Sequence, residues 1–164
     1  TDPGPVQALT ETWNGSSWTE TSNLNTARQG LSGSGVAYTA ALGFGGISTP
    51  PSNSVAITES WDGTSWTEVG DLNTDRAFGG GGGTTTAALM FGGTQDPPRL
   101  ANTEQWNGTS WTEVNDLNTA IYFTTGDGTV TSAILGSGFT TTTVGTAETW
   151  TGAGANSTVT FTAS

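Results

Sequence analysis

The pattern of apolar and polar positions predicts short β-strands. Between residues 55 and 61, Val55, Ile57, Glu59 and Trp61 alternate with smaller or polar residues, which is the period of two that is typical of a strand. Over one stretch of the chain we predict four consecutive strands, at Gln29–Val36, Thr39–Gly46, Val55–Trp61 and Ser65–Val69. Asp62-Gly63 separates the last two and predicts a type I′ hairpin turn, which needs positive φ at both central residues.

This pattern repeats along the chain. The units read ETWNGSSWTETSNLNTAR from Glu11, ESWDGTSWTEVGDLNTDR from Glu59, EQWNGTSWTEVNDLNTAI from Glu104 and a degenerate ETWTGAGANSTVTF from Glu148. Their first tryptophans are Trp13, Trp61, Trp106 and Trp150, at spacings of 48, 45 and 44 residues. That period matches one blade of a propeller. We therefore predict an all-β, β-propeller-like repeat fold of four-stranded antiparallel blades.

Strand counting gives roughly three and a half blades in one continuous repeat domain. We expect an N-terminal outer hairpin at 1–27, blades at 28–73 and 74–118, and a degenerate blade at 119–164, whose alternating tail Thr158–Ala163 predicts a last strand. Propellers typically have four to eight blades, so the ends of this array expose strand edges. Three arrangements stay open: part of a longer propeller, a small closed ring, or an assembly of copies, which we favour.

A second repeated block reads AALGFGG at Ala40–Gly46 and AALMFGG at Ala87–Gly93, and decays to SAILGSG at Ser132–Gly138. The combined order of a Gly pair, two tryptophans, Leu and Arg resembles the Kelch motif, with Trp61 where Kelch repeats usually have Tyr. The match weakens at the ends, because Ile121 replaces the Arg and the last unit has no second Trp. The WNGTSWTE units are also similar to repeats in large structural and fibre proteins of marine bacteriophages.

The Kelch resemblance implies structural roles for the repeated residues. The Gly pair would let the second strand of a blade pack closely, the aromatic residues would fill the space between blades, and the Arg would tie neighbouring strands. These residues are Gly45, Gly46, Gly92, Gly93, Trp13, Trp18, Trp61, Trp66, Trp106, Trp111, Trp150, Arg28 and Arg76. Each Trp can bury roughly 150–250 Å².

The charge balance narrows the range of partners. The formal net charge is −11, the only cations are Arg28, Arg76 and Arg99, and the chain has no Lys, His or Cys. Nucleic-acid binding needs cations that neutralise phosphates, so we do not expect it. No apolar run is long enough for a membrane-spanning segment, and we expect no membrane insertion. An acidic, Thr- and Gly-rich chain without Lys fits an extracellular or virion surface.

We expect no enzymatic activity, cofactor or metal, because the usual bases and nucleophiles are absent. The repeated Glu11, Glu59, Glu104 and Glu148 could form a glycosidase-like acid pair. Their periodicity favours structural carboxylates that are hydrogen-bonded or paired with Arg28 or Arg76.

Two further groups have a chemical and a structural interpretation. The glycines at Gly79–Gly83 look like a phosphate-binding loop, but they lack its Lys and we predict an inner strand. The carboxylates of Asp71, Asp75, Asp96, Asp116 and Asp127 could bind Ca²⁺, but they follow no known calcium-loop pattern, and we expect solvated turns.

The loops between the second and third strands of each blade vary in length, as binding loops on rigid scaffolds do. Candidate ligand residues there are Pro50, Pro51, Asn53, Asp96, Pro97 and Arg99. Our leading hypothesis is a structural or adhesive surface module that assembles with itself, or with other surface or virion proteins, into an oligomer or fibre. The alternative is a propeller lectin that recognises cell-surface glycans.

Overall fold

The computed structural model describes residues 5–49, 53–95, 97–152 and 157–160, which form strands joined by turns and loops. Within these ranges, no helix is long and apolar enough to cross a bilayer. The strands are β1 (Glu11–Trp13), β2 (Trp18–Glu20), β3 (Arg28–Gln29), β4 (Ser32–Ala37), β5 (Ala40–Phe44), β6 (Ile47–Ser48), β7 (Asn53–Ser54), β8 (Thr58–Trp61), β9 (Trp66–Glu68), β10 (Gly80–Gly83), β11 (Ala88–Phe91), β12 (Thr103–Trp106), β13 (Trp111–Val114), β14 (Thr125–Thr129), β15 (Ser132–Phe139), β16 (Thr143–Trp150) and β17 (Ser157–Thr160).

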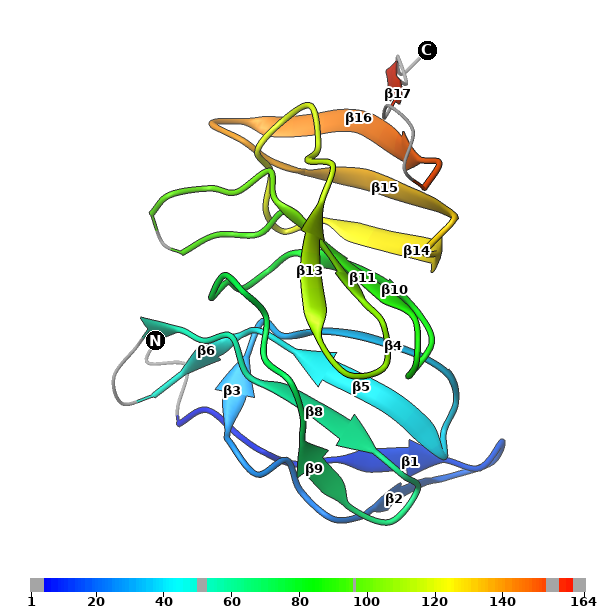
Figure 1. The fold of residues 1–164 in the computed structure, drawn as a ribbon. Coiled ribbons are helices and arrows are strands. Elements are labelled where there is room, and N and C mark those ends of the chain that lie inside the picture. The colour runs from blue at the N-terminus through cyan, green and yellow to red at the C-terminus, as the bar shows by residue number, and fades with distance from the viewer. Residues whose placement is uncertain (1–4, 50–52, 96, 153–156, 161–164) are drawn as a thin grey trace.

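Three four-stranded antiparallel sheets make up most of the molecule. Their strand orders are β4-β5-β8-β9, β10-β11-β12-β13 and β14-β15-β16-β17. The hairpin β1-β2 and the small sheet β3-β6-β7 complete the described strands. Figure 1 shows the sheets following one another, with β1-β2 at one end of the molecule and β14–β16 at the other. The all-β fold of repeated four-stranded antiparallel sheets, predicted from the sequence, is confirmed.

The predicted strands of the first blade are close to the observed ones, but the turn type is wrong. Trp61 pairs with Trp66, which leaves a four-residue loop in which Gly63 has a φ of 93°. Asp62 has no positive φ; its Oδ1 accepts hydrogen bonds from the backbone N–H groups of Thr64 and Ser65, at 2.8 and 2.9 Å. The side chain therefore closes a longer loop, and a type I′ turn is not needed.

Glycine is required where the inner strands of neighbouring sheets meet. Gly79–Gly83, which resembled a phosphate loop, supplies the inner strand β10. A Cβ added to Gly81 would lie 2.6 Å from the carbonyl oxygen of Gly33 in β4. A Cβ added to Gly82 would lie 3.2 Å from the backbone nitrogen of Gly128 in β14. The inner strands thus approach so closely that a side chain would force them apart.

Each of the two Gly pairs follows the second strand of its sheet and makes a close backbone contact there. Gly45-Gly46 follows β5, and the N–H of Gly46 donates to the carbonyl oxygen of Arg76 at 2.8 Å. Gly92-Gly93 follows β11, and Gly93 donates in the same way to Ile121. A Cβ on Gly45, whose φ is +68°, would lie 2.5 Å from the Arg76 oxygen. The contact is made with the segment that leads to the next sheet.

Two apolar clusters lie between consecutive sheets. The first joins Leu42 and Phe44 of β5 to Met90, Trp106 and Trp111 of the second sheet. The second cluster joins the second and third sheets, and its members include Leu89, Phe91, Ile121, Leu135 and Trp150. All four residues of β11 are buried because a sheet lies on each side of it. The core is therefore a series of layers between sheets, as expected for a repeat array.

Candidate functional site

A buried polar cluster recurs between the repeats, and its most complete copy is centred on Glu104 of β12. The backbone N–H and Nδ2 of Asn73 donate to Glu104 Oε2 at 2.7 and 2.8 Å. Arg76 Nη2 donates to Glu104 Oε1. Asn73 Nδ2 also donates to the carbonyl oxygen of Trp111 at 3.0 Å. Through Glu104 and Asn73, the cluster thus joins the loop that ends one sheet to two strands of the next.

Two further copies follow the same plan with less complete partners. Glu59 accepts from the backbone N–H and Nδ2 of Asn25, both at 2.7 Å, and its Oε1 lies 3.2 Å from Arg28 Nη2. Glu148 accepts from the same two groups of Asn118, at 2.7 and 3.0 Å. Ile121 takes the place of the Arg there, and within the described residues Glu148 forms no salt bridge.

Both repeat arginines also hold backbone carbonyl groups. Arg28 donates to the oxygens of Ile57 and Gly43, at 3.0 and 3.2 Å. Arg76 donates to those of Gly92 and Asn102, at 3.2 and 2.6 Å. Burial lowers the pKa of both guanidinium groups, and the neighbouring glutamates oppose that shift. Each arginine therefore holds carbonyl groups of two separate segments of the chain.

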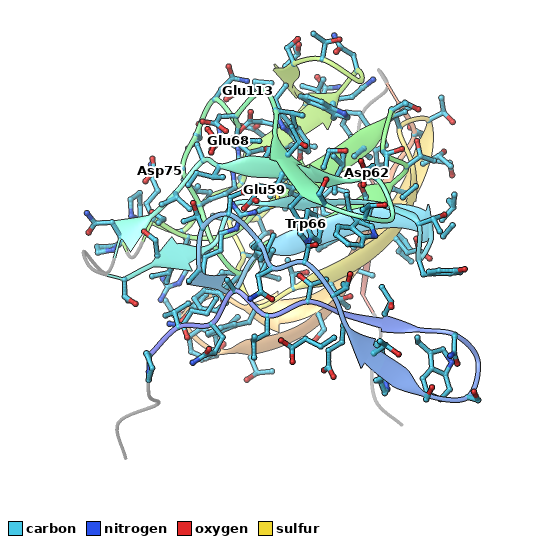
Figure 2. The ribbon with its side chains drawn as sticks, turned by 90° about the horizontal axis from the view of Figure 1, so that it is seen from below. Glu59, Asp62, Trp66, Glu68, Asp75 and Glu113 are labelled. Atoms are coloured by element: carbon cyan, nitrogen blue, oxygen red, sulfur yellow. The ribbon has the colours of Figure 1, made fainter. Side chains whose placement is uncertain are left out.

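The glutamates do not form an accessible acid pair. Glu59 and Glu104 are fully buried and hold structural partners, and Figure 2 shows Glu59 within the layers of strands. Glu148 is also buried, whereas Glu11 is exposed on the hairpin. A substrate could reach Glu59 or Glu104 only if the cluster came apart, so the geometry offers no support for hydrolysis by these residues.

The aspartates considered as calcium ligands act mostly as local acceptors. Asp71 Oδ1 accepts from the N–H of Thr58 at 3.1 Å, and Asp127 Oδ1 accepts from the N–H of Gly128 at 2.7 Å. Within the residues that the structure describes, no three acidic side chains gather in a way that could hold a metal ion. Asp96 lies outside those residues.

Two of the variable loops meet at Asp75. Its Oδ2 accepts from Ser54 Oγ in the first loop, and its Oδ1 accepts from Gln95 Nε2 in the second, both at 2.8 Å. Asn53 is exposed in β7 beside Ser54. The candidate residues Pro50 and Pro51 lie outside the described residues. The two loops therefore share one edge of the molecule, where Figure 2 labels Asp75.

Arg99 lies in the second loop and faces aromatic residues of the third repeat. Its guanidinium carbon is 5.5 Å from the ring centroid of Tyr122 and 6.0 Å from that of Phe139. A recess of about 310 Å³ is lined by Thr94, Pro97, Pro98, Arg99 and Tyr122. Sequence reasoning pointed to Pro97 and Arg99 but missed Tyr122, because no repeated pattern marks it.

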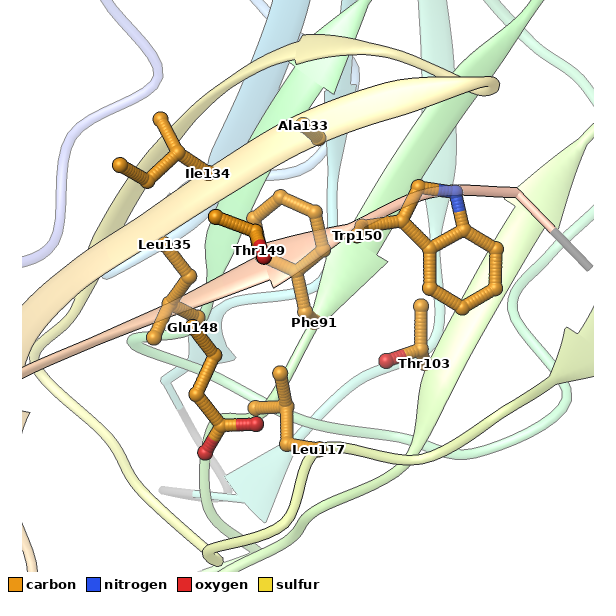
Figure 3. Close-up of a pocket in the computed structure, with 9 residues that line it drawn as sticks. All are labelled: Phe91, Thr103, Leu117, Ala133, Ile134, Leu135, Glu148, Thr149 and Trp150. Carbon is orange, nitrogen blue, oxygen red and sulfur yellow. The ribbon is translucent and has the colours of Figure 1, made fainter. Parts of the chain in front are cut away.

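A small apolar cavity in the third repeat reflects the missing second tryptophan (Figure 3). In the earlier repeats, Trp66 Nε1 donates to Thr10 Oγ1 and Trp111 Nε1 donates to Thr58 Oγ1, both at 3.0 Å. The equivalent hydroxyl, of Thr103, is buried and has no partner within the described residues. In sequence, Ala155 stands where the earlier repeats have this Trp, five residues after the first Trp of the unit; it lies outside the described residues.

The two ends of the array expose large apolar side chains that the inner repeats bury. Trp13 and Trp18 on the hairpin are 43% and 63% exposed, whereas Trp61, Trp106 and Trp111 are buried. At the other end, Ile134 of β15 is 48% exposed. β15 alternates between exposed and buried residues over its first four positions. One face of the last sheet is therefore open to solvent.

Comparison with known proteins supports the fold. No protein-family model matches the chain, and no curated protein matches it in sequence. Among solved structures, one described as "Structure of YjhT" is similar, with a TM-score of 0.76 and 11% sequence identity. The match covers 93% of this chain and 52% of that chain. This chain therefore has the fold of about half of the longer protein.

Proposed function

We propose that this chain is a non-catalytic structural or adhesive module that assembles through the ends of its sheet array. The observation that carries the proposal is the contrast in burial between β11 and β15, since the same repeated strand is buried on both faces inside the array and open on one face at its end. A sheet face that is packed inside the array and unpacked at its end is a surface on which a further sheet can pack, as neighbouring repeats of an array do. The setting that we propose is an extracellular filament or a virion appendage.

The length of the structural match supports this interpretation. The similar structure is a chain about twice as long, of which the match covers 52%. A second copy of this chain is one way to continue the array over an equivalent length. The acidic composition, with no Lys, is compatible with an exposed surface location.

The mass in solution tests the proposal most directly. Light scattering after size exclusion should give a mass of at least two chains, and negative-stain images should show rings or fibres. A strictly monomeric species of 16.6 kDa across a wide concentration range would contradict assembly.

A second candidate function is glycan binding in the recess beside Arg99. Arg99 is an exposed cation that lies against an aromatic ring, and the two groups together offer hydrogen-bond donors and a stacking surface to a sugar. A glycan array should then give hits that Arg99→Ala and Tyr122→Ala remove, while Tyr38→Ala, at an exposed aromatic residue in the turn after β4, serves as a control. An array without hits would argue against this function and leave the assembly proposal standing.

A further inference from the structure

The contact between the first two sheets shows which side chains pack together when one repeat follows another. We use it as a template for the contacts that the two ends of the array can make. On one side of it, Leu42 and Phe44 of β5 face the following sheet. On the other side, the pair Trp106 and Trp111 packs against them, with the rings of Phe44 and Trp111 4.9 Å apart. In this contact, the tryptophan pair of the second sheet thus covers the apolar face of the sheet before it.

The hairpin β1-β2 carries the same tryptophan pair, but no repeat precedes it in the described residues. The rings of Trp13 and Trp18 are 5.5 Å apart at an interplanar angle of 44°. Trp106 and Trp111 have the same separation and the same angle. The exposed pair is therefore already arranged as it is in a buried contact, which lowers the entropy cost of binding.

The last sheet presents the other half of the template. Within the block AALGFGG and its decayed copy SAILGSG, Ile134 corresponds to Leu42 and Gly136 corresponds to Phe44. Leu42 is buried, whereas Ile134 is about half exposed. A Cβ added to Gly136 would meet no atom within 4 Å. This face of β15 is therefore equivalent to the face of β5 that Trp106 and Trp111 bury, but no residue pair packs on it within the described residues.

We propose that a second copy of this chain binds head to tail, with its Trp13 and Trp18 on the open face around Ile134. The inference rests on the proposed assembly function and names the two surfaces that meet. Figure 1 shows the hairpin β1-β2 and the strand β15, which carry these residues, at opposite ends of the molecule, so one chain offers both halves of the contact. Such a heterologous contact forms a ring where the rotation closes, and a filament where it does not.

The residues of the open face around Ile134 should make the proposed contact between copies weaker than the contact between the first two sheets. Gly136 supplies no ring where Phe44 meets Trp111. Ala147 stands where Thr58 accepts a hydrogen bond from an indole N–H, so Trp18 Nε1 finds no hydroxyl there. We therefore expect reversible association that depends on concentration.

Complementation between two variants tests the head-to-tail arrangement. Trp18→Ser removes one surface and Ile134→Asp removes the other, and both residues are exposed enough to leave the fold intact. Each variant alone should be monomeric. Their equimolar mixture should form 1:1 dimers, because each variant keeps the surface that the other has lost. Tyr38→Ser, which removes an exposed aromatic residue from the turn after β4, should assemble as the unchanged chain does.

The possible outcomes separate this inference from the general proposal. If the unchanged chain is monomeric, both fail. If it assembles and Ile134→Asp still forms dimers alone, the hairpins meet each other, and only the head-to-tail contact is overturned. A mixture that stays monomeric, from variants with unchanged near-ultraviolet circular dichroism, would also overturn it.

A gain-of-association variant provides an independent check. Gly136→Phe restores the ring that Phe44 provides in the template, at a position where the isolated chain has space. An added aromatic pair should tighten association by about 2- to 10-fold, measured by sedimentation at several concentrations. No change in the association constant, or an equal gain in Trp18→Ser, would contradict the proposed pairing.

Discussion

At the scale of single residues, Thr58 and Thr103 occupy equivalent positions, but among the described residues only Thr58 has the indole partner of a second tryptophan. Comparing substitutions at the two positions therefore shows how much this hydrogen bond contributes to stability. Thr58 accepts from Trp111 Nε1, whereas the buried hydroxyl of Thr103 has no partner within the described residues. Thr58→Val should therefore destabilise the protein by about 1 kcal/mol or more, because it leaves a buried indole N–H unpaired. Thr103→Val should be neutral or stabilising. Urea unfolding of the two variants makes this comparison, and equal losses would show that the hydroxyls are not distinguished by their partners.

A turn residue gives the expected dependence on pH. Hydrogen bonds from the N–H groups of Ser65 and Thr64 lower the pKa of Asp62 below its ordinary value of 3.8. The carboxylate therefore stabilises the fold above that value, and the contribution is lost as the pH falls through the lower, folded-state pKa. Asp62→Asn should remove this acid-side loss and leave stability near pH 7 little changed, since Asn14 and Asn107 close the same turn elsewhere. Thermal unfolding between about pH 2 and pH 7 tests it; identical pH profiles would argue against the assignment.

The residue scale also shows where reading the sequence fell short. Periodicity pointed to structural glutamates and to Arg28 and Arg76, and the structure places these groups together. It missed Asn73 and its equivalents, although the triplet Leu-Asn-Thr stands in three units. An Asn beside a loop is usually explained by the turn itself, and the Glu that each Asn contacts lies in the next unit, at a separation that varies, so the sequence spacing did not indicate a buried partner.

At the scale of elements, alternation and repeat length were enough to predict the strands of the repeated four-stranded sheets, because each sheet buries the same pattern. They did not predict the small sheet β3-β6-β7, of which β6 and β7 lie in the variable loop. The turn type was not predictable in the same way, since a short Asp or Asn side chain can close a longer loop that the dipeptide alone does not reveal. The recess beside Arg99 joins residues of two repeats, and residues that do not recur leave no periodic signal.

Glycines in two strands separate close packing from an open face. Gly81 of β10 faces backbone atoms of β4, so Gly81→Ala should destabilise the protein by about 1–3 kcal/mol through overpacking. Gly136 of β15 faces open space, so Gly136→Ala should be neutral or slightly stabilising, because alanine loses less backbone entropy. Denaturant midpoints measured on monomeric samples compare the two. A larger loss at Gly136 would mean that its face is not open.

At the scale of the whole molecule, charge and burial act on assembly in opposite directions. Each chain carries a formal net charge of −11, so two copies repel one another, and Asp127 lies opposite Ile134 in the last sheet; the side chains proposed to meet, Trp13, Trp18 and Ile134, are apolar. Raising the salt concentration from about 0.01 M to about 0.15 M shortens the Debye length from about 30 Å to about 8 Å, which weakens the repulsion and leaves apolar contact almost unchanged. The assembled fraction should therefore rise with salt, as light scattering at fixed protein concentration would measure. A fall with salt would show that ion pairs hold the copies together, and Trp18 and Ile134 would then not be the centre of the contact.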